Sequence, residues 1–289
     1  MSISIFTGKV YLSTNPREEF IYKGQKPKRG YLKRVSALIR GHQIAEALKA
    51  KLNPPTGYKN DICIYVKPEP DQDGRYKFEG KKQYLDIIDG EGYISFLKNY
   101  PNVKAIVCSE HDYLVASTHG LIQRTVLVPQ HHCNWDREAR TRTTVTTVGA
   151  IGNRTGLGYI PAELKQRLAK RGMEFIESWQ FFSRQDVLDF YKKIDIQVVW
   201  RPYMLKRALS NPLKIVNAAS FGIPPVALDE PTFKEIGNCC VGVATLDELL
   251  TQIDRLRASP ALYQAFSRLC RLTAERYHID NIVKLYQKL

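Results

Sequence analysis

The clearest indication of the fold of this chain comes from the stretch NPLKIVNAASFGIPPVALDEPTFKEI, residues 211–236. Its pattern predicts a helix over PLKIVNAASFG, a strand over PPVAL and a further helix over TFKEIG. Gly222 allows the chain to leave the first helix in a conformation that residues with a Cβ disfavour, and Ile223 and Pro224 then begin the strand. A helix that returns directly to a short apolar strand indicates an α/β fold with helices packed on a parallel sheet.

The same alternation of short apolar strands and amphipathic helices extends to both sides of this stretch. It predicts two doubly wound, Rossmann-like domains, each with a parallel sheet covered on both faces. The polar segment HHCNWDREARTRT interrupts the alternation after Pro129. We therefore expect an amino-terminal domain over residues 1–138 and a carboxyl-terminal domain over residues 139–289.

The remaining elements are expected in the following segments. Strands are expected in ISIFTGKVYLS (3–13), DICIYV (61–66), VKAIVCS (103–109), TVLVPQ (125–130), TTVTTVGAIG (143–152), MEFIES (173–178), IQVVW (196–200) and CVGVA (240–244). The segment KQYLDIID (82–89) fits either a strand or a short helix. Helices are expected in GYLKRVSALIRGHQIAEALKAKL (30–52), GYISFLKNY (92–100), DYLVASTHGLI (112–122), ELKQRLAKRG (163–172) and DVLDFYKK (186–193), and from about Leu246 and Pro260.

The composition excludes several classes of protein. The 289 residues are 44% hydrophobic and 25% charged, as in an ordinary globular protein. No segment approaches the roughly 18 uninterrupted apolar residues of a membrane helix, and the first residues lack the pattern of a signal peptide. The six cysteines are scattered without a C-x-x-C pair, which argues against a disulfide framework or a zinc site. We therefore expect a cytoplasmic protein with no transmembrane segment and no bound metal.

The formal net charge of +14 is unusually high, and the excess is concentrated in the first sixty residues. It is densest in KGQKPKRGYLKRVSALIRG, residues 23–41. A field of this sign favours partners that carry phosphates, such as a nucleotide-sugar, a nucleic acid or an anionic membrane surface. The alternative is a solvated basic face without a specific partner.

Ligands of open α/β sheets bind beyond the carboxyl ends of the strands, where free N–H groups at helix starts favour anions. Two such domains that face each other would form a cleft between them. Lys214 lies near the start of a predicted helix, and guanidinium groups match phosphate oxygens with two hydrogen bonds. The expected anion-binding residues of the second domain are Gly152, Asn153, Arg154, Arg201 and Lys214.

The first domain is expected to supply the acceptor side of the cleft. His111 follows a predicted strand, and His131 lies in the segment between the domains, so both are candidate catalytic bases. The paired histidines at 131 and 132 fit a polar hinge equally well. The candidate acceptor contacts are Lys9, Arg34, Arg40 and His132.

Residues 211–236 resemble the donor domain of the group 1, GT-B glycosyltransferases. The shared features are a helix start that bears a lysine, a turn of the form Asn/Glu–Ala–x–x–x–Gly–x–Pro, a strand, and a loop that ends in glutamate. VGAIGNRTG (148–156) resembles the first strand and loop of that domain. DYLVASTHGLIQRTVLVPQHHCNWD (112–136) resembles the end of the partner domain, and RGHQIAEAL (40–48) resembles the first helix of the acceptor domain.

The resemblance implies a GT-B fold, in which two Rossmann-like domains face each other across a cleft. It implies a hexosyltransferase-type glycosyltransferase that uses a nucleotide-sugar as co-substrate and needs no prosthetic group. It also implies that a loop glutamate, Glu235 or Glu230 with a slight preference for Glu235, accepts hydrogen bonds from ribose or sugar hydroxyls. The acceptor would be bound by the first domain and can be anionic, for example a nucleic acid.

The chain departs from the family pattern at one important place. Group 1 enzymes usually carry two glutamates eight positions apart, and this sequence aligns Asn217 and either Leu209 or Ser210 with them. We keep Asn217 as a donor-binding residue at the aligned position. The alternative function is a GT-B-like module that has lost catalysis and binds nucleic acid or another polyanion.

Overall fold

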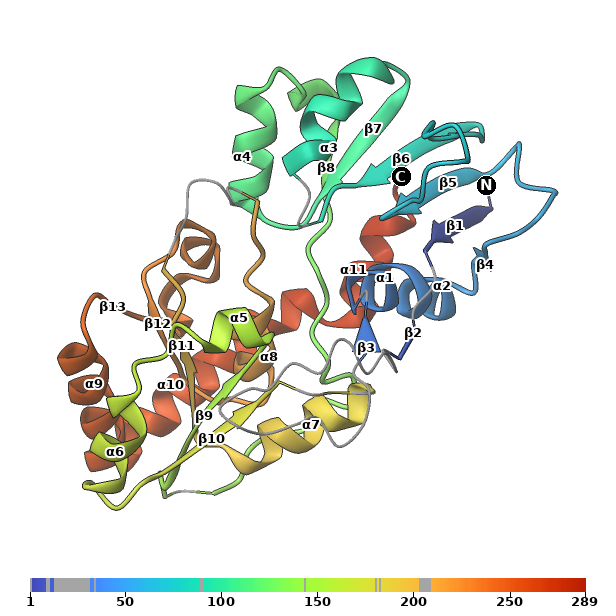
Figure 1. Ribbon diagram of the computed structural model, residues 1–289. Helices are drawn as coiled ribbons and strands as arrows, with labels where there is room; N and C mark the ends of the chain where they lie inside the picture. Colours follow the sequence, from blue (N-terminus) through green and yellow to red (C-terminus); the bar gives the residue numbers. More distant parts are fainter. Residues whose placement is uncertain are drawn as a thin grey trace.

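The computed structural model describes residues 2–8, 11–12, 32–33, 35–88, 91–142, 144–179, 181, 183–202 and 209–289. The chain forms two α/β lobes, each built on one parallel sheet (Figure 1). Helices cover both faces of each sheet, so the predicted fold class is confirmed. Within the described ranges, no helix is long and apolar enough to cross a membrane.

The first lobe contains a six-stranded parallel sheet with the order β4-β1-β5-β6-β7-β8. Helices α2 and α11 pack on one face, and α3, η3 and α4 pack on the other. The ambiguous segment at 82–89 contains strand β6. The elements are β1 (Ile3–Thr7), β4 (Lys51–Leu52), β5 (Ile62–Val66), β6 (Lys82–Asp86), β7 (Val103–Val107), β8 (Thr125–Leu127), α3 (Glu91–Phe96), η3 (Leu97–Asn99), α4 (Glu110–Thr118) and η4 (Ile122–Arg124). The short strands β2 (Tyr11–Leu12) and β3 (Leu32–Lys33) form a separate antiparallel pair.

The helix expected over residues 30–52 contains a π-helical turn. It consists of α1 (Val35–Ala37), the π-helical segment η2 (Leu38–His42) and α2 (Gln43–Leu48). Gly41 lies in this turn so close to β1 that a Cβ would stand 2.9 Å from the side chain of Thr7. The turn therefore brings the helix onto the end of β1, where Arg40 is buried.

The second lobe contains a five-stranded parallel sheet with the order β10-β9-β11-β12-β13. Helices α6 and α9 pack on one face, and α7 and α8 pack on the other. The elements are β9 (Thr147–Ile151), α5 (Arg154–Leu157), α6 (Glu163–Ala169), β10 (Glu174–Ser178), α7 (Arg184–Lys193), β11 (Ile196–Val199), α8 (Leu213–Ser220), β12 (Pro225–Leu228), η6 (Pro231–Cys239), β13 (Val241–Val243), α9 (Leu246–Ala258) and α10 (Pro260–Ala274).

The carboxyl terminus returns to the first lobe. After η7 (Glu275–Tyr277), helix α11 (Ile279–Tyr286) packs beside α2 on the first sheet. Ile282 and Tyr286 share a core with Ile5 and Ile62, and the Tyr84 hydroxyl donates to the Leu289 carbonyl over 3.0 Å. Residues 279–289 therefore pack with the first sheet, although the sequence pattern does not separate them from residues 139–278.

Candidate functional site

A cavity of about 330 Å³ lies between the two lobes. The helical segment 35–43 and His131 line it from the first lobe, and the ends of β9, α7 and α8 line it from the second. Its wall is mainly apolar, with a few polar groups. The lining residues that the argument uses are His131, Gly152, Asn153, Arg184, Lys214 and Asn217. The structure thus gathers four of the predicted donor residues with one predicted base.

Lys214 projects over the turn that follows β9. Gly152 stands directly beneath its side chain, because a Cβ at Gly152 would lie 2.7 Å from the Lys214 Nζ. Asn153 then begins α5, and its Oδ1 accepts a hydrogen bond from the Gly156 amide over 2.7 Å. Within the described part of the chain, the Lys214 Nζ has no hydrogen bond or ion pair. This ammonium group is therefore available to an anion in the cavity.

The surroundings of Lys214 act against its positive charge. Burial, followed by the nearby Arg201 guanidinium, lowers the pKa of Lys214 to about 8, while Glu230 opposes the shift. A lysine whose pKa is lowered beside a second cation indicates a site where the positive charges are not fully compensated by negative charge. A bound phosphate would supply that charge.

Arg201 is held in place by Glu230. The Arg201 Nη2 donates to both carboxylate oxygens of Glu230, over 2.9 and 3.0 Å. Glu230 is only 1% exposed, and its Oε1 also accepts from the hydroxyls of Ser210 (2.6 Å) and Thr232 (2.9 Å). Glu230 therefore orients Arg201 and has little capacity left for a ligand hydroxyl.

Glu235, the second loop glutamate, bridges two other parts of the protein. Its Oε2 accepts from the Glu110 amide over 2.6 Å, and its Oε1 accepts from the Tyr277 hydroxyl over 2.8 Å. Burial raises the pKa of this carboxyl. Its predicted contact with ribose or sugar hydroxyls stays a prediction, since both oxygens already accept hydrogen bonds within the protein.

The remaining predicted donor residues lie around the cavity. The Arg154 guanidinium stacks over the Trp179 ring, with 4.8 Å between Cζ and the ring centroid. Asn217 lines the cavity, and its Oδ1 accepts from the Cys133 amide over 2.9 Å. Asn217 thus ties the segment between the lobes to α8. The side-chain oxygen of Asn217 makes this contact, because the Cys133 amide is a donor and needs an acceptor.

The paired histidines are buried where the two lobes join. The His131 Nε2 lies 3.1 Å from the Ile39 carbonyl, and its Nδ1 lies 3.4 Å from the indole nitrogen of Trp135. The Nδ1 also lies 3.1 Å from the His132 carbonyl, so a neutral ring can donate to only one of the two carbonyls. Burial lowers the pKa of His131 to about 4 and that of His132 to about 3, so both are neutral at pH 7.

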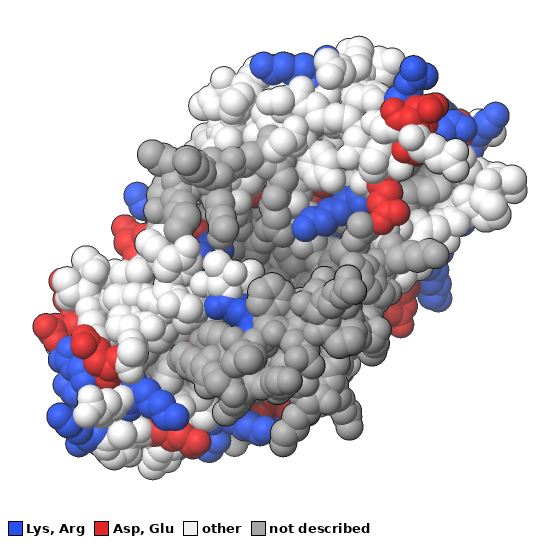
Figure 2. Space-filling model, in the orientation of Figure 1, with Lys and Arg blue, Asp and Glu red and all other residues white. Residues whose placement is uncertain are grey.

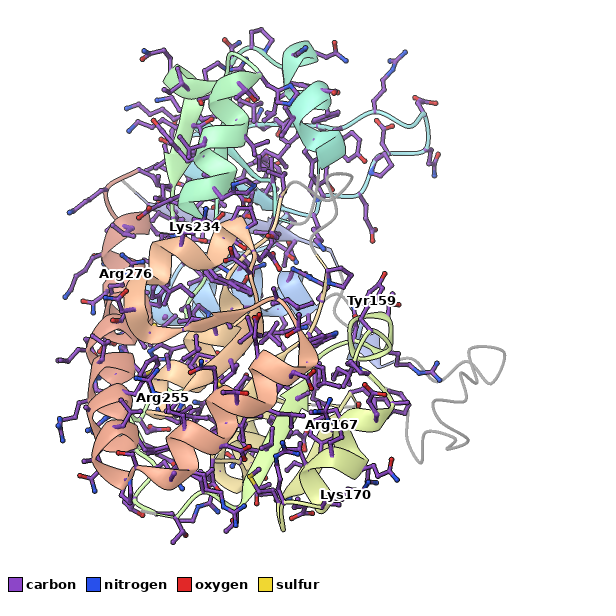
Figure 3. The ribbon with its side chains drawn as sticks, turned by 90° about the vertical axis from the view of Figure 1, so that its left-hand side faces the viewer. Tyr159, Arg167, Lys170, Lys234, Arg255 and Arg276 are labelled. Carbon is purple, nitrogen blue, oxygen red and sulfur yellow. The ribbon has the colours of Figure 1, made fainter. Side chains whose placement is uncertain are left out.

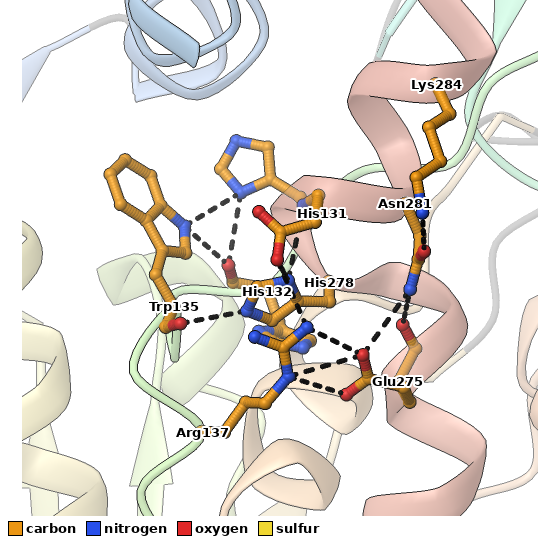
Figure 4. Close-up of polar contacts among 9 residues, drawn as sticks. His131, His132, Trp135, Arg137, Glu275, His278, Asn281 and Lys284 are labelled. Carbon is orange, nitrogen blue, oxygen red and sulfur yellow. Dashed lines mark hydrogen bonds and ion pairs between the residues drawn. The ribbon is translucent and has the colours of Figure 1, made fainter.

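The segment that contains these histidines is fastened to the carboxyl-terminal region (Figure 4). The Trp135 indole donates to the His132 carbonyl over 3.1 Å, and the His278 Nε2 donates to the Trp135 carbonyl over 2.9 Å. Arg137 forms an ion pair with Glu275 over 2.9 Å. The hinge alternative for the paired histidines stays a prediction, and His131 also lines the cavity.

Four predicted first-lobe residues either do not line the cavity or lie outside the described residues. His111 is the second residue of α4 and does not line the cavity. Lys9 and Arg34 lie outside the described residues. Arg40 is 1% exposed, and its Nε pairs with Asp86 over 2.5 Å. Arg40 was predicted to contact the acceptor, but it has almost no accessible surface with which to do so.

Arg184 also lines the cavity, but it was not among the site residues predicted from the sequence. Its Nη1 donates to the Cys133 carbonyl over 2.9 Å, and its guanidinium stacks over the Trp135 ring at 4.3 Å. The available signal was local: Ser183 and Asp186 form a capping box that places Arg184 at the first position of α7. Among the described residues, no group of three or more His, Cys, Asp or Glu side chains could hold a metal ion.

No protein-family model matches the chain, and a search of curated proteins finds no match. Solved structures do match it. HepE of Anabaena, in complex with UDP, has a TM-score of 0.59 and 10% identity over 100% of this chain and 99% of its own. A mutant of S. aureus TarM, in complex with fondaparinux, alpha-GlcNAc-glycerol and UDP, has a TM-score of 0.54 and 17% identity over 81% of this chain and 52% of its own.

A glycosyltransferase from Rickettsia africae also matches, with a TM-score of 0.51 and 11% identity over 89% of this chain and 81% of its own. The chain spans about half the length of TarM and of other first matches. Identities this low compare folds and not activities. The chain therefore has the GT-B fold, with two Rossmann-like domains that face each other across a cleft, as in the glycosyltransferases that it matches.

Proposed function

We propose that the protein is a glycosyltransferase that binds the diphosphate of a nucleotide-sugar beneath Lys214. The observation that carries this proposal is the Lys214 ammonium, which lies over Gly152 in an interlobe cavity without a partner among the described residues. Arg201 stands within electrostatic range and is held by Glu230. UDP is the proposed nucleotide, because the matched HepE and TarM structures contain UDP.

The chemistry required of these residues is stabilisation of a leaving group. An acceptor hydroxyl attacks the anomeric carbon of the sugar, and the bond from that carbon to the diphosphate oxygen breaks. UDP leaves with the bonding electrons, and the hydroxyl proton passes to the diphosphate or to water. Lys214 and Arg201 would offset the negative charge that develops on the diphosphate, without a metal ion.

The proposal does not extend to a particular acceptor. Basic and acidic side chains alternate over both lobes in Figure 2, which shows one face of the molecule. Most of the basic stretch that suggested a polyanion, residues 23–41, precedes the described helix. No described contact favours a nucleic acid over a neutral hydroxyl compound, so the degenerate polyanion-binding module is not carried further.

The proposal is tested by thermal unfolding in the presence of UDP, GDP, ADP, CMP and dTDP and of their sugar conjugates. A ligand at about 100 times its dissociation constant adds roughly 2.7 kcal/mol to the free energy of unfolding. We expect UDP and at least one UDP-sugar to raise the melting temperature more than the other nucleotides do. If no nucleotide raises the melting temperature, the proposed function is overturned.

The affinity for UDP is expected to fall at alkaline pH because of Lys214. Its pKa of about 8 means that the charged form binds the diphosphate below this pH and is lost above it. UDP binding should weaken about tenfold between pH 7 and pH 9, as measured by isothermal titration calorimetry. Lys214→Arg serves as the control, since a guanidinium stays charged and should give a flat profile over this range. A flat wild-type profile would exclude Lys214 as the diphosphate contact.

A further inference from the structure

A short segment of the second lobe, Leu209–Ser210, is anchored in the first lobe. The Leu209 side chain is 5% exposed and belongs to the core beneath α3 and α4, together with Ala116 and Leu121. Leu209 follows Arg201 by eight residues and precedes α8. The chain therefore reaches from the donor arginine into the first lobe before it returns to the donor lysine.

The backbone of Ser210 is bound on both sides by the amino-terminal end of α4. The Ser210 amide donates to the Asp112 Oδ1 over 3.0 Å. The Ser109 hydroxyl donates to the Ser210 carbonyl over 3.0 Å. Asp112 is 2% exposed and Ser109 is fully buried, so water competes little for these two hydrogen bonds.

The side chain of Ser210 points the other way, into the second lobe. Its hydroxyl donates to the Glu230 Oε1 over 2.6 Å, and the same Glu230 carboxylate receives both hydrogen bonds from Arg201. A continuous path of hydrogen bonds thus runs from Asp112 through Ser210 and Glu230 to Arg201. Every member except Arg201 is buried.

We propose that Asp112 is a positioning residue of the donor site, which fixes Ser210 across the lobe interface and thereby holds Glu230 and Arg201 in place for the diphosphate. The inference rests on the proposed function for its ligand and on the hydrogen bonds above for its geometry. It makes the first lobe responsible for the arrangement of a donor residue in the second. Nothing in the sequence pattern connected these two positions.

A second contact at the same junction supports this role. Figure 3 shows α4 above η6, which carries Lys234, with Arg276 close by. Here the Glu110 amide donates to Glu235, as described above, and Arg276 also donates to the Tyr277 hydroxyl over 2.6 Å. The start of α4 is therefore the part of the first lobe that holds the loop after β12. If the lobes separate, Ser210 loses its bonds to Asp112 and Ser109, and Glu235 loses its bond from the Glu110 amide.

The inference is tested with Asp112→Ala and two companion variants. Glu110→Gln removes another acidic side chain from the first turn of α4 but keeps the amide that binds Glu235, so it controls for helix stability. Asp112→Asn keeps an oxygen acceptor for the Ser210 amide. Burial raises the pKa of Asp112 to about 7, so a neutral side chain of the same shape is a close substitute.

Two measurements separate the outcomes. Hydrogen exchange of the Ser210 amide, without ligand, should be about tenfold faster in Asp112→Ala and unchanged in Glu110→Gln and Asp112→Asn. UDP affinity should fall about tenfold in Asp112→Ala and in Ser210→Ala, and Asp112→Asn should restore it. Unchanged UDP affinity in Asp112→Ala, or no rescue by Asp112→Asn, overturns the inference. Failure of the wild-type protein to bind UDP overturns the proposed function instead. In that case the hydrogen-exchange experiment, which needs no ligand, still tests the contact between Asp112 and Ser210.

Discussion

Lys214→Ala is expected to weaken UDP binding at least about 30-fold. Removal of one partner from a buried pair of opposite charges costs about 2–5 kcal/mol, and 1.4 kcal/mol corresponds to a factor of ten. Lys214 is half-buried and lies directly over Gly152, so Lys214→Ala removes the ammonium group that stands over this turn. Isothermal titration calorimetry with UDP at pH 7 measures the effect.

Two variants make this result specific. Lys170→Ala removes an exposed lysine at the end of α6, remote from the interlobe cavity (Figure 3), and should leave the affinity unchanged. Gly152→Ala keeps the ammonium but displaces it, because the new Cβ would stand 2.7 Å from Nζ. It should weaken binding with little loss of stability, since the displaced atom ends a flexible side chain. Wild-type affinity in Lys214→Ala would show that the diphosphate does not bind here.

Arg40→Ala is expected to lower the free energy of unfolding by about 3–5 kcal/mol, the usual cost of removing one partner from a buried ion pair. Asp86 is fully buried, and loss of Arg40 would leave its carboxylate without the opposite charge 2.5 Å away. The Val128 carbonyl would also lose its 2.8 Å hydrogen bond from the Arg40 Nη1. Urea denaturation followed by circular dichroism measures the change.

A surface ion pair provides the matched control. Lys192 and Glu138 are 2.8 Å apart, but their side chains are 43% and 39% exposed. Lys192→Ala should therefore leave the free energy of unfolding nearly unchanged, because an exposed ion pair contributes little. If Arg40→Ala is as stable as Lys192→Ala, the buried ion pair contributes little to the free energy of unfolding.

The sequence contained enough information for the local elements and for the class of fold. Residues 211–236 form α8, β12 and η6 as predicted, although η6 is a 3₁₀ helix and not an α-helix. The Lys214 and Gly152 positions followed from the rule that anions bind beyond strand ends. These features depend on residues that are close together in the chain. A sequence pattern that spans one or two helical turns is therefore sufficient to predict them.

The partners of individual side chains were not predictable in this way. Arg40 stands in a strongly basic segment, and the pattern gave no sign that a π-helical turn directs it toward Asp86. In the family alignment, Leu209 or Ser210 stands only where the family usually has a glutamate. In the structure, both residues make contacts with the first lobe. These contacts join residues 46 positions apart for Arg40 and Asp86 and 98 positions apart for Ser210 and Asp112, and periodicity carries no information about them.

The return of α11 to the first sheet also sets an order of events during synthesis. Strand β8 of the first sheet ends at Leu127, yet Tyr286 belongs to the core on which that sheet packs. At about 5–20 residues per second, a ribosome needs roughly 8–30 seconds to add the residues between them. For that interval α2 is the described helix that covers this face of the sheet, and the core around Ile5 and Ile62 lacks its contacts with α11. The helix that completes the first lobe is thus made only after the whole second lobe.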